Sequence, residues 1–263
     1  MEKYKWNAGE YSKYSSAQKK WAQESVERVN LKSHEHVLDV GCGDGKITVE
    51  IAGLVPEGSA VGIDNSEEMI ELAKNKFPKS NHPNLSFQVL DARFINFKNE
   101  FDVILSNAAL HWVNEHVRIL KGMHGSLKPG GRILLQMGGK GNVPEAFSIV
   151  NKVISYPVWS AYFENFKFPY YFYSVEEYKA FLSQTEFKRT KVEIVEKDMQ
   201  HKGNEGVTGW IKTTWLPYLE KVPGAKKEEF IELLFAEYAK KFPPDSNGFY
   251  HATAKRLIVT AEK

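Results

Sequence analysis

The ten residues from Val37 to Lys46, VLDVGCGDGK, constrain the fold more than any other part of the chain. An apolar run ending in Asp39 leads into three alternating glycines, and a helix-like stretch follows. A strand, a glycine turn and a helix in this order are typical of an α/β sheet that binds a ligand at the carboxyl ends of its strands. Glycine lets a ligand approach the backbone where a Cβ would collide. We therefore predict a ligand site at this turn.

The spacing of the glycines separates this turn from two common phosphate-binding loops. A dinucleotide fingerprint, G-x-G-x-x-G, needs a third glycine at position 46, which is Lys46, whereas Gly45 comes one residue early. A P-loop needs Gly-Lys-Ser/Thr, which does not follow. An acidic residue two positions before G-x-G-x-G instead resembles the first motif of the class I S-adenosylmethionine-dependent methyltransferases. Further segments match that family in order: Ala60–Asp64 (AVGID), Leu85–Leu90 running into Asp91, Phe101–Ser106, and Lys128–Gly131 before Arg132–Met137.

The resemblance implies S-adenosyl-L-methionine as cofactor and S-adenosyl-L-homocysteine as its product. The resemblance also implies that Asp64 binds the ribose hydroxyls. Its distance from the glycine loop suggests the same, although that spacing alone would suit NAD and an oxidoreductase equally. By the same resemblance, we expect Asp91 to lie beside the adenine amino group. The remaining expected cofactor contacts are Asp39, Gly41, Cys42, Gly43, Asn65, Met69, Ala92 and Asn107.

The order of elements predicts an α/β fold. We expect a seven-stranded, mostly parallel Rossmann-like sheet, in which the resemblance makes the last strand antiparallel. The expected helices are Lys46–Leu54, Glu67–Phe77, Val113–Ser126, Val175–Ser183, Gly206–Leu219 and Lys226–Phe242. A single methyltransferase domain would span residues 1–263, with an N-terminal cap segment at 1–31 and helical substrate-cap insertions at 138–188 and 203–250. The dense aromatics of Tyr156–Tyr173 either line a substrate site or pack the first insertion on the sheet.

The composition of the chain limits the classes of molecule that it is expected to bind. The net charge is only +2, so nothing indicates nucleic-acid binding, and no apolar run has membrane-spanning length. The single cysteine, Cys42, excludes an internal disulfide and a cysteine-based zinc site, and its place between glycines suits a small packing residue. We expect a cytoplasmic monomer or weak homodimer that acts on a small molecule without a metal ion.

Three residues are candidates for binding or activating the molecule that accepts the methyl group: Gln18, His111 and Trp112. A glutamine amide and an indole N–H donate hydrogen bonds and could hold an oxyanion. His111 could donate too, or act as a base for a less acidic nucleophile. A carboxylate is already ionised at neutral pH, with a reference pKa of about 4, and needs no base.

A closer resemblance rests on three stretches. WNAGEYSKYSSAQ (6–18), NAALHWV (107–113) and GWIKTTWLPYLEKVP (209–223) look like the trans-aconitate and juvenile-hormone-acid methyltransferase families. In the juvenile-hormone-acid branch, residues at the positions of Gln18 and Trp112 are held to position the substrate carboxylate, and His111 falls on a neighbouring position. Neither insertion contains an arginine, the expected partner of a tricarboxylate, which favours a monocarboxylate with an apolar tail. The alternatives are an N-, C- or hydroxyl O-methyltransferase with His111 as base, and a non-catalytic sensor that binds the cofactor.

Overall fold

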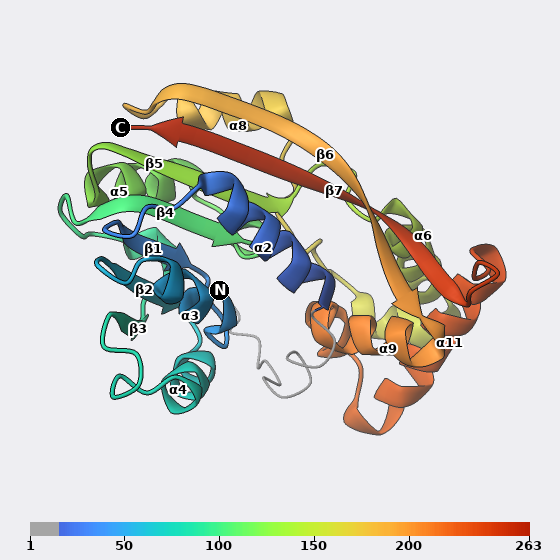
Figure 1. Ribbon diagram of the computed structural model, residues 1–263. Coiled ribbons are helices and arrows are strands. Elements are labelled where there is room, and N and C mark those ends of the chain that lie inside the picture. The colour runs from blue at the N-terminus through green and yellow to red at the C-terminus, as the bar shows by residue number, and fades with distance from the viewer. Residues whose placement is uncertain (1–15) are drawn as a thin grey trace. The chain divides into compact units, whose positions relative to one another are not determined.

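The computed structural model describes residues 16–263, and the side chains from Trp21 onward, as two compact units (Figure 1). The sheet unit comprises residues 18–140, 170–195 and 256–263. The helical unit includes residues 141–169 and 196–255. Residues 170–188, which the sequence analysis assigned to the first insertion, thus group with the sheet. The division into one methyltransferase domain with substrate caps stays a prediction.

The strands form one seven-stranded sheet in the order β3-β2-β1-β4-β5-β7-β6. Strand β1 pairs in parallel with β2 and β4, β2 with β3, and β4 with β5. Strand β7 pairs antiparallel with β5, so the predicted mostly parallel sheet with an antiparallel last strand is confirmed. The strands are β1 His36–Val40, β2 Ser59–Asp64, β3 Leu85–Val89, β4 Phe101–Asn107, β5 Leu127–Gly138, β6 Lys188–Lys202 and β7 Phe249–Glu262.

Helices cover both faces of the sheet unit (Figure 1). Alternate side chains of a strand point to opposite faces, so Val37 packs into one apolar core and Leu38 into the other. The first core joins the sheet to helices α2 (Ser16–Val29), α3 (Lys46–Leu54) and α4 (Glu67–Lys76). The second joins it to α5 (His116–Ser126) and α8 (Val175–Leu182). Both cores brace the central strands whose ends carry the glycine loop.

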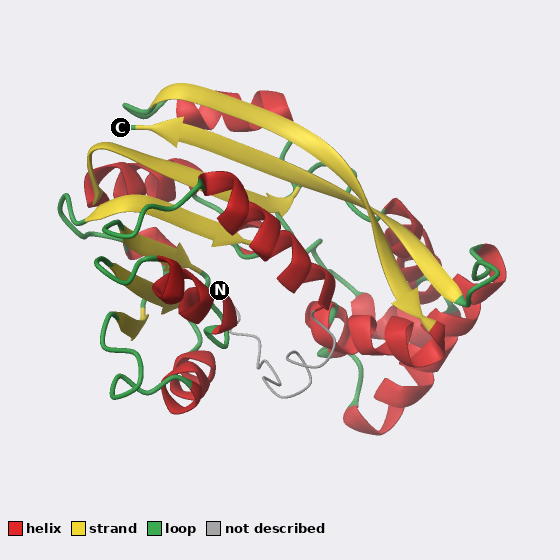
Figure 2. Cartoon of the chain, viewed as in Figure 1, coloured by secondary structure: helices red, strands yellow, loops and turns green. Residues whose placement is uncertain are grey.

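The helical unit contains the helices α6 (Pro144–Ile154), α7 (Pro157–Ser160), α9 (Gly203–Thr214), α10 (Leu216–Leu219) and α11 (Lys227–Lys241). Figure 2 draws helices in red and strands in yellow. Its apolar centre is aromatic. The ring centroid of Trp159 lies 5.0 Å from that of Phe230, and the ring of Phe163 stacks on Phe230 at 5.7 Å. Part of the aromatic run at 156–173 therefore packs within the helical unit itself, whereas the two interpretations offered for it were a substrate site and packing on the sheet.

Two expected helices begin or break differently from the prediction. The helix expected over 206–219 is interrupted at Trp215, because Pro217 in the first turn of α10 has no N–H with which to continue α9. The helix expected from Val113 begins only at His116. A 3₁₀ turn at Leu110–Trp112 precedes it, and Glu115 at its start has a positive φ of 62°. Further 3₁₀ turns span Ala92–Phe94, Ala161–Phe163 and Gly224–Lys226.

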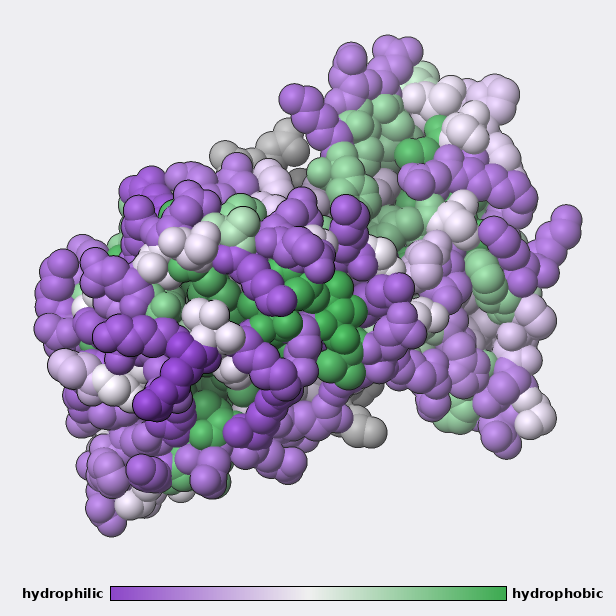
Figure 3. Space-filling view, turned by 90° about the horizontal axis from the view of Figure 1, so that it is seen from above, coloured by the Kyte–Doolittle hydropathy of each residue, from purple (hydrophilic) through white to green (hydrophobic). Residues whose placement is uncertain are grey.

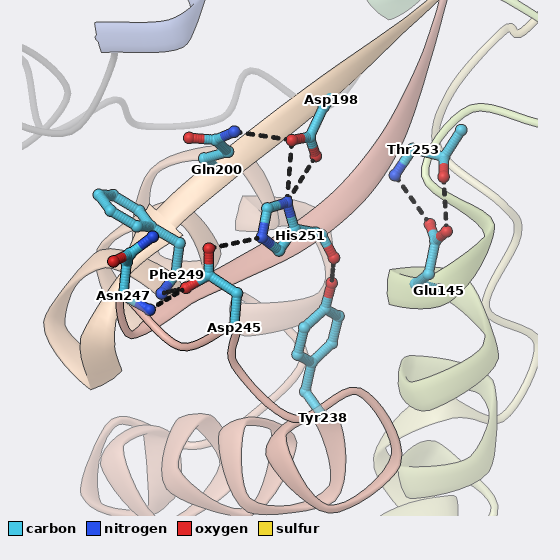
Figure 4. A network of polar contacts seen from close by, with 9 residues as sticks. All are labelled: Glu145, Asp198, Gln200, Tyr238, Asp245, Asn247, Phe249, His251 and Thr253. Atoms are coloured by element: carbon cyan, nitrogen blue, oxygen red, sulfur yellow. Dashed lines mark hydrogen bonds and ion pairs between the residues drawn. The ribbon is translucent and has the colours of Figure 1, made fainter.

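A polar network ties elements of the helical unit together (Figure 4). His251 on β7 bonds through Nδ1 to both carboxylate oxygens of Asp198 on β6, at 3.0 and 2.9 Å, and its Nε2 lies 3.5 Å from Asp245. The Tyr238 hydroxyl of α11 donates to the carbonyl of His251. Glu145 of α6 accepts from the backbone N–H of residue 253 at 3.0 Å. Charge and hydrogen bonds thus supplement aromatic packing in this unit.

The visible face in Figure 3 is mostly hydrophilic, with hydrophobic residues in smaller areas. Within the part of the chain that the structure describes, no helix combines the length and apolarity that crossing a membrane requires.

Candidate active site

The glycine loop leaves the sheet where the strand order changes direction. Strand β1 lies between β2 and β4, and α/β sheets bind ligands outside the carboxyl ends of strands at such a point. Gly41 follows β1 with a φ of +77°, and a Cβ built on it would lie 2.2 Å from the Cβ of Ala109, which follows β4. The two loops therefore touch. An added Cβ on Gly43 would meet none of the atoms that the structure describes within 4 Å, so the backbone there is open to a ligand on the side of the described residues.

Asp64 ends β2 beside this loop. One of its carboxylate oxygens accepts from the backbone N–H of Gly43 at 3.1 Å, and the other accepts from that of Ser66 at 2.9 Å. Burial raises the pKa of Asp64, while these backbone hydrogen bonds oppose the rise. Each oxygen keeps lone pairs for further donors. A rigid carboxylate beside an open glycine backbone suits the ribose hydroxyls of the expected cofactor.

The other loop residues differ in what their side chains contact. Asp39, within β1, accepts from the Thr48 hydroxyl at 2.8 Å, and burial raises its pKa to about 6. Cys42 is buried, and an added Cβ on Gly62 would lie 2.9 Å from its sulfur. Burial also raises the pKa of the Cys42 thiol well above its usual value, so this residue packs rather than reacts. Asn65 is exposed at the start of the next loop.

Just past the carboxyl end of β3, Asp91 is held by an arginine. Arg93 donates from Nε at 3.0 Å and from Nη2 at 2.6 Å to the two oxygens of Asp91. Ala92, the residue between these two in the sequence, begins a short 3₁₀ helix. Burial acts to raise the pKa of Asp91, but the hydrogen bonds and charge of Arg93 outweigh it and lower the pKa. Met69 is buried on α4, and its N–H donates to Ser66. The predicted cofactor contacts of these residues stay predictions.

Helix α2 is attached to the carboxyl end of the sheet through one buried amide. The Nε2 of Gln136 on β5 lies 2.8 Å from Oδ1 of Asn107, 3.1 Å from the carbonyl of Trp21 and 3.1 Å from the Ser25 hydroxyl. Gln18 belongs to the same helix, but its side chain lies outside the described residues, as do Trp6, Asn7, Tyr11 and Tyr14. The predicted contact of Gln18 with the substrate carboxylate stays a prediction.

His111 and Trp112 form the 3₁₀ turn after β4. The Trp112 ring lies 4.9 Å from that of Tyr170, and the His111 ring lies 5.7 Å from that of Phe172. Nδ1 of His111 accepts from the backbone N–H of Gly138 at 3.4 Å. Burial, followed by the nearby charges of Arg256 and His116, lowers the pKa of His111 to about 3. The ring is therefore neutral at pH 7, with its proton on Nε2.

The backbone around this turn is strained. Ala108, immediately after β4, has a φ of +54°, and Glu115 has a φ of +62°. Such conformations cost a side chain of the L configuration about 1–2 kcal/mol and concentrate at functional sites. The two strained residues bracket His111 and Trp112 and fix how they leave the sheet.

Comparison with known proteins agrees with this geometry. Residues 31–193 match the family described as "Methyltransferase domain". The chain belongs to this methyltransferase family. It is 30% identical to methyltransferase C70.08c of Schizosaccharomyces pombe, over 79% of each chain, and 26% identical to trans-aconitate 2-methyltransferase of Methylobacterium nodulans, over 98% of each. Among solved structures, phosphoethanolamine N-methyltransferase 2 of Haemonchus contortus has the same fold, with a TM-score of 0.60 and 19% identity, over 93% of this chain and 52% of that one. That structure contains S-adenosylhomocysteine and phosphomonomethylethanolamine.

The prediction of a methyltransferase with a Rossmann-like sheet is thus confirmed. Within the methyltransferase, sequence reasoning missed Arg256. This residue lies on β7 directly opposite Gly138 of β5 and is only 4% exposed. Its guanidinium carbon lies 4.9 Å from the centre of the Trp21 ring. The strand alternation could have found it, because Ala252 and Ala254 are buried on the same face at intervals of two residues.

Proposed function

We propose that this methyltransferase transfers a methyl group from S-adenosyl-L-methionine to a carboxylate oxygen of a small organic acid. The donor follows from the family and from the fit of the glycine loop and Asp64 to a nucleoside. When bound, S-adenosyl-L-methionine supplies an electrophilic methyl carbon, which a carboxylate oxygen can attack without losing a proton. The protein then has to bind, orient and desolvate the acceptor.

The loop residues would hold the donor. No described atom lies where a Cβ on Gly43 would, and the oxygens of Asp64 retain lone pairs that a ribose diol could use. The contact between Gly41 and Ala109 joins the loop after β1 to the loop after β4. Because His111 follows Ala109 by two residues, donor and acceptor sites would share one edge of the sheet.

The state of His111 is the observation that carries the assignment to a carboxylate. A general base works best with a pKa near the operating pH, and a pKa of about 3 makes this ring a poor one. Its Nδ1 is also occupied by the Gly138 N–H. What remains is a neutral Nε2–H, a hydrogen-bond donor. A donor without a base suits a nucleophile that is already ionised.

The relatives support the same chemistry. Trans-aconitate 2-methyltransferases of several bacteria align along 98% of this chain at 25–26% identity, and their name specifies an acid as the acceptor. The aromatic rings of Tyr170, Phe172 and Trp112 around His111 would favour an acceptor with an apolar part.

The test is to incubate the full chain with heavy-methyl S-adenosyl-L-methionine and single candidate acids, and to identify products by mass spectrometry. Trans-aconitate, decanoate and farnesoate cover the polycarboxylate, fatty and isoprenoid classes. We expect a heavy methyl ester from at least one of them. Decanamide and decanol serve as matched acceptors without a carboxylate.

A heavy label on the amide nitrogen or the alcohol oxygen, with no ester from any acid, would contradict the proposal and favour a base-dependent methyltransferase. Binding of the donor without label in any product, including those from a cell extract, would favour the sensor.

A further inference from the structure

We propose that Arg256 binds the carboxylate of the acceptor and makes this methyltransferase selective for anionic acceptors. This inference rests on the proposed function and adds a binding residue that the sequence did not reveal. It comes from the packing of β7 on β5 within the sheet unit.

The register of the two strands places Arg256 at the candidate acceptor site. Arg256 is paired with Gly138, and the backbone N–H of Gly138 donates to Nδ1 of His111 at 3.4 Å. The positive charge of Arg256 also acts on His111 directly, as one of the causes that lower the pKa of that ring. A guanidinium, a strand-end backbone and an imidazole thus lie next to one another at the carboxyl end of β5.

The surroundings of Arg256 strengthen its interaction with an anion. The side chain is almost completely buried, and its guanidinium lies over the indole of Trp21. Removal from water makes a charge interact more strongly with an opposite charge, since the effective dielectric constant falls. The planar guanidinium matches a carboxylate and can donate two parallel hydrogen bonds to it. A neutral acceptor of the same shape would gain little of this energy.

Arg256 and His111 have different roles because one is charged and the other is neutral. A carboxylate has about four lone-pair positions, of which a guanidinium occupies two. Lone pairs therefore remain for the Nε2–H of His111 and for attack on the methyl carbon. Arg256 supplies the charge that recognises the anion, whereas the neutral imidazole orients it.

A purely structural role makes different predictions. If Arg256 only packed against Trp21 to hold α2 on the sheet, its replacement would weaken charged and neutral ligands alike and would lower the melting temperature. If it binds a carboxylate, the loss falls on anionic ligands alone.

The experiment measures binding by calorimetry with S-adenosyl-L-homocysteine present. The ligands are decanoate and trans-aconitate as anions and decanamide as a neutral counterpart, and the proteins are the wild type, Arg256→Gln and Arg256→Lys. The matched control is Arg189→Gln, which removes a highly exposed arginine from neighbouring β6. The affinity for S-adenosyl-L-homocysteine and the melting temperature verify that each variant is folded.

We expect Arg256→Gln to weaken the better-bound anion about 10- to 100-fold, the loss of a hydrogen-bonded charge, while decanamide binding changes by less than about threefold. Arg256→Lys should recover part of the loss, and Arg189→Gln should bind as the wild type does. In a histidine titration, loss of the Arg256 charge should raise the pKa of His111, a shift that Arg256→Lys would largely prevent.

Two outcomes would overturn the inference. One is an equal loss of affinity for the anion and for decanamide in Arg256→Gln, and the other is unchanged affinity for both anions in that variant. If the wild type esterifies an acid in either case, the proposed function survives while this inference fails. Arg256-dependent binding of an anion that is never methylated would support the inference and contradict the proposed function. If the wild type neither binds nor methylates any acid, both are wrong.

Discussion

His111 illustrates how surroundings decide the role of a single residue. An ordinary histidine titrates near pH 6.5 and is the usual candidate for a base. Here burial, with the charges of Arg256 and His116, lowers the pKa to about 3, and the Gly138 N–H occupies the nitrogen that could accept a proton. The residue type suggested two roles, and its environment favours the donor.

This assignment predicts a pH profile. Asp39, with a pKa of about 6, is largely ionised above pH 7, and neither His111 nor an acceptor carboxylate changes charge there, so kcat/KM should stay level between pH 7 and 8. His111→Gln keeps an N–H donor and should lose less than about tenfold in kcat, whereas His111→Phe, which has none, should lose more. If His111 were a base, His111→Gln would instead collapse kcat by about 10²- to 10⁴-fold. Steady-state kinetics on the best acid separate the two cases.

At the scale of elements, the glycine loop depends on the close approach of Gly41 to Ala109, which leaves no room for a side chain at position 41. A Cβ at Gly41 would overlap that of Ala109, and the positive φ there already disfavours any residue but glycine. The loop after β1 can therefore approach the loop after β4 only because position 41 has no side chain.

We expect Gly41→Ala to destabilise the fold by about 2–4 kcal/mol, from backbone strain and overpacking together. Movement of the loop should also lower the affinity for S-adenosyl-L-homocysteine by about tenfold or more. The matched control is Gly53→Ala on the exposed side of α3. An added Cβ meets no described atom within 4 Å there, so the change should be neutral or stabilising by up to about 1 kcal/mol. Chemical denaturation measures the stability of each variant, and calorimetry measures its affinity for S-adenosyl-L-homocysteine. Wild-type affinity in Gly41→Ala would show that the loop does not hold the donor.

For the whole molecule, the two units are stabilised by different means. The sheet unit has two apolar cores on opposite faces of a strand layer. The helical unit combines an aromatic centre with the network around His251 (Figure 4). Its stability should therefore respond to pH in a range where the cores of the sheet do not.

The pKa of His251 is raised, chiefly by its hydrogen bond to Asp198 and also by Asp245. A group with a raised pKa in the folded state stabilises the fold fully below its unfolded pKa, about 6.5, and ceases to do so as the pH rises through the folded value. The wild type should melt above His251→Gln at pH 6, and the difference should close by pH 9. The matched control, His34→Gln at an exposed position, should give no such convergence. A difference that does not vary with pH would mean that His251 stabilises without its charge.

Local patterns in the sequence were enough for much of the fold. Helices α3, α4 and α8 lie within a residue of their predicted ends, because apolar periodicity and capping residues act over short distances. Strand β5, by contrast, begins at Leu127 and not at Arg132, since pairing with β4 extends it beyond its apolar run. Breaks such as that at Pro217 depend on single residues and were missed.

The sequence by itself determined the family, the strand–loop–helix unit and the acid at the end of β2, because each is written in neighbouring residues. Only the tertiary structure decided that Arg256 lies beside His111, since the antiparallel pairing of β7 with β5 joins segments far apart in the chain. It also decided the protonation of His111, because a pKa is set by burial and by the charges that folding brings near. The chemistry proposed here depends on that second kind of information.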